Sequence, residues 1–147
     1  MNCNYVSTET LYWLMLRGNE MQNIESSAKK AKDIVMEFIE ALERNDFKTV
    51  RGCISDNISV LAPGPVELTT FKQAEPYVTY LEHSNPRLDI KKEFADINDV
   101  CLLYDATYRE PPVTVFVCGW FHVNDDGKID SIRFIADPRK LLEQMGK

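Results

Sequence analysis

The sequence predicts a single α+β domain in which helices come first and a curved antiparallel sheet follows. As far as about residue 84, apolar residues recur at spacings of three and four, which is typical of amphipathic helices. After Pro86 the period changes to about two, and the later strands are joined by short turns that allow a meander. We therefore expect the early helices to cover one face of the sheet, and we exclude a doubly wound fold.

Composition limits the functional classes. The chain has 147 residues, 44% apolar and 27% charged, which is ordinary for one globular domain. Its 23 acidic and 17 basic residues give a net charge of -6, so a broad nucleic-acid contact is not expected. No run of 18 apolar residues occurs, so no membrane span is expected either.

The cysteines favour a reducing compartment. Cys3, Cys53, Cys101 and Cys118 have no Cys-x-x-Cys spacing, and the last three lie among apolar residues. The even number also allows disulfides, but we favour buried free thiols and a cytoplasmic location.

Residues 1–20 differ from the rest and are expected to be an N-terminal extension to a domain formed by residues 21–147. The apolar run at residues 11–16 is short and has no basic region before it, which makes a poor signal peptide. One interpretation is an early start or a loosely attached extension that is not native to the domain. The alternative is a short helix that docks on the domain or on a partner.

Three helices are expected before the main sheet. Ser26 or Ser27 can cap the first helix, which ends at Asn45, and Asp46 can cap a short second one. A short strand at residues 58–60 and a turn at residues 63–65 follow. A third helix begins at Thr69 or Thr70 and is kinked at Pro76, or it begins late with Pro76 in its first turn.

The strands are expected after residue 86. The first spans residues 88–94 with its alternation broken at Lys92, and the next spans residues 101–109. Residues 113–123 and 128–136 form a hairpin around an Asn-Asp-Asp-Gly turn. Asp137 then caps a terminal helix with Pro138 at its first position.

Three segments carry a family resemblance. Residues 35–47 read VMEFIEALERNDF, residues 53–58 read CISDNI, and residues 120–129 read WFHVNDDGKI. From about Ala28 to Leu142 their order and spacing resemble the NTF2-like superfamily, and within it the SnoaL-like branch. The resemblance implies a cone in which a bent sheet wraps a long first helix, with two shorter helices and a pocket between. It also implies homodimers through the outer sheet face. Members include ketosteroid isomerases, polyketide cyclases and limonene epoxide hydrolases, so the fold does not fix the chemistry.

The catalytic groups of those relatives are hard to place. The ketosteroid-isomerase pattern puts its tyrosine, base and oxyanion carboxylate at Phe38, Ala62 and Gly119, none of which has the required group. The cyclase pattern leaves Asp105 and Asp137 as weak candidates. Asp137 is explained by its capping role, and Asp105 by a charge pair with Arg109 or Arg133 on the outer face.

We expect no cofactor and no metal, because the two histidines have no ligand-like cluster around them. An apolar, aromatic pocket is expected between the first helix and the sheet, with Tyr104 and Tyr108 as polar handles and weak catalytic candidates. The alternative for each pocket residue is a plain core position. The expected lining is Val35, Phe38, Leu42, Tyr77, Leu81, Tyr104, Tyr108, Phe121, Ile132 and Phe134.

The residues Phe116, Trp120 and His122 alternate onto the outer sheet face and are expected to form a homodimer face; a ligand role for His122 is the alternative. The sequence is thus interpreted as a protein that binds a small hydrophobic or aromatic molecule. Two alternatives stay open: a SnoaL-like cyclase, isomerase or hydrolase acting on a small cyclic or carbonyl compound, and a pure assembly protein with a filled hollow.

Overall fold

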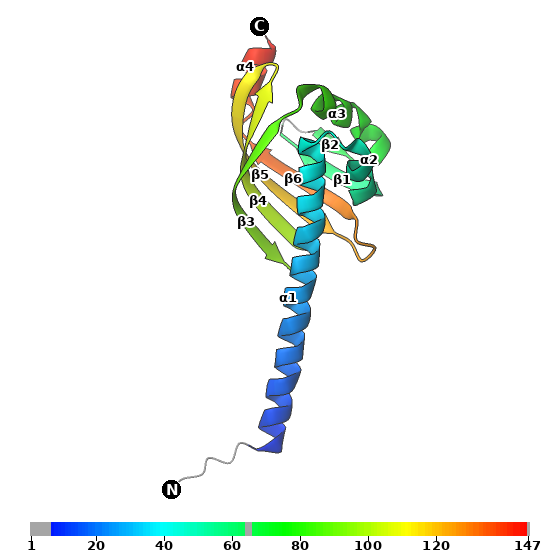
Figure 1. Cartoon of the computed structure of the whole chain (residues 1–147), viewed down its shortest axis with the longest axis vertical. Coiled ribbons are helices and arrows are strands. Elements are labelled where there is room, and N and C mark those ends of the chain that lie inside the picture. Colours follow the sequence, from blue (N-terminus) through cyan, green and yellow to red (C-terminus); the bar gives the residue numbers. More distant parts are fainter. Residues whose placement is uncertain (1–6, 64–65, 147) are drawn as a thin grey trace.

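A six-stranded sheet curves around the C-terminal half of one long helix in the computed structural model, which describes residues 7–63 and 66–146 (Figure 1). The strand order is β2-β1-β6-β5-β4-β3. All neighbouring strands are antiparallel except β1 and β6, which are parallel. The α+β class and the curved sheet are confirmed, but the sheet is mixed rather than antiparallel throughout, because β1 arrives from α2 and not from a hairpin with β6.

The first helix is longer than expected. Helix α1 spans Thr8–Glu43, and Ser7 caps it by accepting a hydrogen bond from the backbone N–H of Thr10 at 3.2 Å. Ser26 and Ser27 therefore lie inside the helix and do not begin it. Helix α1 passes through residue 20 without a break. The division of the chain into an extension and a domain at that residue stays a prediction. Residues 1–6 lie outside the described part.

The short second helix is confirmed. After α1, Asn45 adopts a positive φ of 55°, which turns the chain. Asp46 then caps α2, Phe47–Cys53, by accepting hydrogen bonds from the backbone N–H of Thr49 at 3.1 Å and its hydroxyl at 2.7 Å. At its other end α2 passes directly into β1, because Ile54 already has extended backbone angles.

Helix α3 spans Phe71–Ser84 and begins before Pro76, so the late start is wrong. Thr70 caps it through the backbone N–H of Gln73 at 3.3 Å, and Asn85 ends it in the left-handed region. The expected turn at residues 63–65 lies mostly outside the described residues.

The register between neighbouring strands shifts at three places in the described sheet, one of them between Ile54 and Ser59 in β1. Between β3 and β4 the register slips at Lys91, which explains the broken alternation predicted at Lys92. Between β5 and β6 the pairs His122–Ser131 and Val123–Ile129 leave Asp130 as the extra residue. The strands are β1 Ile54–Ala62, β2 Val66–Leu68, β3 Arg87–Asp96, β4 Asp99–Arg109, β5 Pro112–Val123 and β6 Ile129–Ala136.

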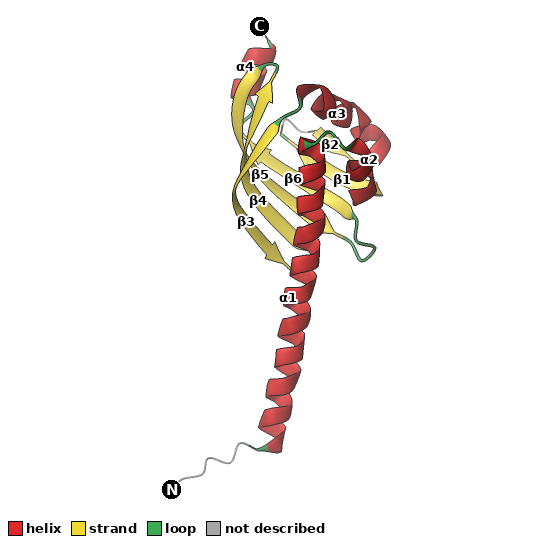
Figure 2. Ribbon diagram, viewed as in Figure 1, coloured by secondary structure: helices red, strands yellow, loops and turns green. Residues whose placement is uncertain are grey.

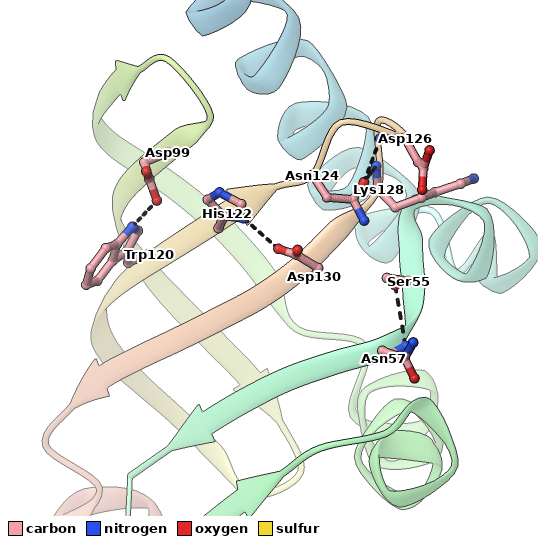
Figure 3. Close-up of polar contacts among 9 residues, drawn as sticks. All are labelled: Ser55, Asn57, Asp99, Trp120, His122, Asn124, Asp126, Lys128 and Asp130. Carbon is pink, nitrogen blue, oxygen red and sulfur yellow. Dashed lines mark hydrogen bonds and ion pairs between the residues drawn. The ribbon is translucent and has the colours of Figure 1, made fainter.

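The predicted turn of the last hairpin is present. The side-chain oxygen of Asn124 accepts backbone N–H bonds from Asp126 at 3.1 Å and Lys128 at 3.0 Å (Figure 3). Gly127 has a φ of 70°, a conformation that favours glycine.

The terminal helix is shifted by one residue from the prediction. Helix α4 spans Arg139–Met145, and Pro138, not Asp137, occupies the capping position. Asp137 still accepts the backbone N–H of Arg139 at 3.1 Å.

The core lies between the concave face of the sheet and α1 (Figure 2). Val35 and Phe121 are fully enclosed there, and the alternating pattern along β4 and β5 places every second side chain inside. Among the described helices none is both long and apolar enough to cross a bilayer.

Candidate functional site

The inner face of the sheet carries a group of aromatic hydroxyls opposite α3. Tyr104 and Tyr108 come from β4, four residues apart, and therefore point to the same face. Tyr80 and Ser84 come from α3, also four residues apart, and so share one face of that helix. The rings of Tyr80 and Tyr108 lie with centroids 6.2 Å apart, which joins the two elements. We call these four residues the hydroxyl cluster.

Two atoms of the hydroxyl cluster are buried without a partner. The hydroxyl of Tyr80 and the Oγ of Ser84 are shielded from water, and no other group in residues 7–63 and 66–146 hydrogen-bonds to them. Ser84 is only 4% exposed and is the one buried polar residue in that part of the chain. A buried hydroxyl without a partner costs free energy, so each such group calls for an explanation.

The phenols of the cluster stay protonated near neutral pH. Burial raises the pKa of Tyr104 strongly, and the neighbouring Tyr108 adds to the shift. Burial also raises the pKa of Tyr108 and of Tyr80. These groups therefore act as hydrogen-bond donors and not as phenolate bases.

Most of the predicted pocket lining belongs to the packed core. The rings of Phe38 and Phe121 meet edge to face at 6.0 Å, and those of Phe121 and Phe134 at 6.2 Å. Val35, Leu42 and Ile132 are buried within the same core, and Leu81 packs against it.

Of the tyrosines in α3, Tyr77 was predicted to line the pocket and Tyr80 was not. Tyr77 is 43% exposed, whereas Tyr80 reaches the sheet in its place. The spacing of four residues between Tyr80 and Ser84 indicates that they share one face of the helix. A serine at such a position does not by itself predict a binding site.

The two carboxylate candidates lie away from the hydroxyl cluster. Asp105 is on the outer face, 3.5 Å from the amine of Lys91, and not paired with Arg109 or Arg133 as expected. Asp137 is exposed, and its contacts with Arg139 lower its pKa to about 2. Neither carboxylate therefore faces the interior of the cone.

The ketosteroid-isomerase positions are occupied by packing residues. A Cβ added to Gly119 would lie 2.8 Å from the Phe121 ring and 3.3 Å from the Tyr104 ring, so no larger residue fits there without movement. Phe38 packs on the same ring, and Ala62 lies at the far end of β1.

The structure is similar to several solved structures. An NTF2-like protein of unknown function from Cytophaga hutchinsonii is 28% identical over 76% of this chain and 94% of its own, with a TM-score of 0.66. The chain has the NTF2-like fold.

Further similar structures agree with this assignment. An epoxide hydrolase of the LEH type from M. tuberculosis is 24% identical over 81% of this chain and 94% of its own, with a TM-score of 0.67. An NTF2-like protein of unknown function from Burkholderia pseudomallei is 12% identical over 80% and 98%, with a TM-score of 0.70. Other matches carry the names of candidate polyketide cyclases and a candidate ketosteroid isomerase. No protein-family model and no curated protein matches the sequence.

The outer face of this NTF2-like sheet carries a second set of aligned side chains. Trp120 donates a hydrogen bond from Nε1 to Asp99 at 2.7 Å, and Nδ1 of His122 lies 2.6 Å from Asp130 (Figure 3). The bulge at Asp130 turns that carboxylate toward the outer face. Phe116 and Trp120 are 56% and 48% exposed there. No group of three or more potential metal ligands occurs among the described residues.

An open groove lies outside the cone of this NTF2-like chain, between α2 and α3. Its volume is about 630 Å³, and an adjoining hollow measures about 400 Å³. The guanidinium of Arg51 lies 4.0 Å above the Phe71 ring and pairs with Asp56, so its charge is already satisfied. Neither space is lined by a residue predicted for the pocket.

Proposed function

We propose that this NTF2-like protein binds a small hydrophobic or aromatic molecule at the hydroxyl cluster. The observation that carries this proposal is the pair of buried, unpartnered hydroxyls of Tyr80 and Ser84. A bound molecule that offers acceptor atoms to these hydroxyls would offset the free energy that their burial without a partner costs.

The surroundings of the cluster favour a flat, largely apolar ligand. Tyr104 belongs to the core and Tyr108 packs against it, and the aromatic rings and branched aliphatic side chains of that core bind apolar surface. The protonated phenols of Tyr104 and Tyr108 supply further donors, so a carbonyl or ether oxygen on an aromatic body fits the donor set.

Catalysis is the second candidate function. The printed names of similar structures include an epoxide hydrolase and candidate cyclases, and Tyr104 or Tyr108 could polarise a substrate oxygen. Acid-base chemistry of this kind also needs a carboxylate beside the substrate. Because the described residues include no buried Asp or Glu, binding without reaction is the better supported function.

A homodimer through the outer sheet face completes the proposal. The side chains of Phe116 and Trp120 are exposed on this face. Ile135 of β6 pairs with Cys118, which lies between them on β5, and is 67% exposed. A contiguous apolar face of this kind favours a protein partner, and the same face of a second copy is the economical one.

The binding proposal is tested with two matched probes, 2-acetylnaphthalene and 2-ethylnaphthalene, which differ in one acceptor oxygen. Wild-type protein should bind the ketone more tightly, by about two- to tenfold, the range of a single hydrogen bond. Tyr80→Phe should reduce the difference and leave hydrocarbon binding unchanged, as measured by isothermal titration calorimetry.

The control variant is Tyr77→Phe, which removes an exposed hydroxyl from the same helix. It should keep the preference for the ketone. Equal binding of the two probes by wild-type protein would contradict the role given to the hydroxyl cluster, and so would loss of the preference in Tyr77→Phe.

A further inference from the structure

We propose that the projecting half of α1 pairs antiparallel with the same segment of a second copy of this chain. Residues 8–26 of α1 are all exposed, whereas burial against the sheet begins near Ala31 (Figure 1). The projecting part is about 30 Å long at 1.5 Å per residue. A single helix of that length is marginal in water, and Gly18 in its interior weakens it further.

A continuous seam runs along the whole helix at alternating spacings of three and four, the pattern of a coiled coil. The C-terminal half of the seam is buried by the sheet. The N-terminal half, centred on Leu14, Met21 and Ile24, is exposed, and none of residues 7–63 and 66–146 buries it. The seam positions are Thr10, Leu14, Arg17, Met21, Ile24, Ala28, Ala31, Val35, Phe38 and Leu42.

Charge selects a second copy and an antiparallel direction. Arg17 lies on the seam and is the one cation among residues 8–28. When two seams run antiparallel with Leu14 opposite the partner's Ile24, each Arg17 lies beside the partner's Glu20. A parallel pair would place Arg17 against the partner's Arg17, which is repulsive.

The exposed area is sufficient for a pair of copies. Five large apolar side chains lie on the seam or directly beside it and together expose on the order of 600 Å² per chain, so a pair of copies buries about 1,200 Å², the lower end for a stable interface. They are Leu11, Trp13, Leu14, Met21 and Ile24. A lipid surface fits less well, because the segment carries Glu9, Glu20 and Glu25 against Arg17 alone, and anionic membranes repel a net negative helix.

The test uses the full chain in sedimentation equilibrium. Leu14→Glu places a charge opposite the partner's Ile24, and Asn19→Glu places the same charge on the opposite side of the helix. All three proteins carry Trp120→Glu, which removes a dimer through the outer sheet face, so their masses report the α1 interface alone. The parent and Asn19→Glu should have the same mass, and Leu14→Glu should have half of it, with association at least about tenfold weaker.

The direction of pairing is tested by charge reversal. Arg17→Glu should weaken association because it faces the partner's Glu20, and Arg17→Glu combined with Glu20→Arg should restore it. Equal masses for the parent and Leu14→Glu would overturn the proposal, and failure of the double variant to restore association would overturn the antiparallel register. Equal masses together with flotation of the parent, but not Leu14→Glu, on phosphatidylcholine vesicles would assign the segment to lipid instead.

Discussion

The hydroxyl of Tyr80 should destabilise the ligand-free protein, so removing it should stabilise the fold. This atom is buried and has no hydrogen-bond partner among the described residues. A buried hydroxyl in that condition costs about 1–3 kcal/mol, and the lower end applies here because the Tyr80 ring is only partly buried. Tyr80→Phe should therefore raise the free energy of unfolding by about 1 kcal/mol, which for a chain of this size raises Tm by about 2–4 °C.

The assay is thermal and urea unfolding followed by far-ultraviolet circular dichroism. Tyr77→Phe removes an exposed hydroxyl from the same helix and should change the free energy of unfolding by less than about 0.5 kcal/mol. Ser84→Ala should act in the same direction as Tyr80→Phe, since its Oγ is also unpartnered. A loss of stability in Tyr80→Phe would show that the hydroxyl has a partner in the free protein, and the reasoning behind the hydroxyl cluster would fail.

Three further predictions concern local packing and titration. Gly119→Ala should lower the free energy of unfolding by about 1–3 kcal/mol in urea titration, because its Cβ would meet the Phe121 ring, whereas Gly52→Ala, with open space at its Cβ, should not. The bonds from Thr49 lower the pKa of Asp46, so its contribution to stability is full above about pH 4 and is lost as pH falls through the lowered native pKa. Asp46→Asn keeps a capping residue and should flatten acid unfolding over that range; an unchanged acid profile would contradict this assignment. Because burial raises the pKa of Tyr104, Tyr104→Phe should remove the last phenol to ionise in an alkaline absorbance titration of the folded protein, and loss of an earlier step instead would show that the phenol is accessible.

The sequence by itself determined the fold class and most element positions. The stripe from Ala31 to Leu42, the Asn45–Asp46 break and the Asn-Asp-Asp-Gly turn all report local preferences that the folded chain keeps. The alternation along β4 and β5 correctly separated inner residues from Phe116, Trp120 and His122 on the outer face, because side chains on a strand alternate by geometry alone.

Tertiary structure decided what periodicity cannot express. The parallel pairing of β1 with β6 depends on contacts between segments about 70 residues apart, and no local pattern encodes it. The start of α1 at Thr8 was missed because Ser26 and Ser27 are good caps, yet the seam continues through them. The partner of Asp105 proved to be Lys91, which the bulge in β3 brings across from the neighbouring strand.

The candidate site, like the fold, could be predicted from the sequence only in part. Tyr104 and Tyr108 could be placed from strand alternation, since the inner face of β4 follows from its period of two. Tyr80 and Ser84 could not, because burial of a hydroxyl without a partner is a property of the packed structure and not of the residue type. The sequence therefore determined which groups face inward from the sheet, and only the packing of α3 against that sheet decided which of them are left without a hydrogen-bond partner.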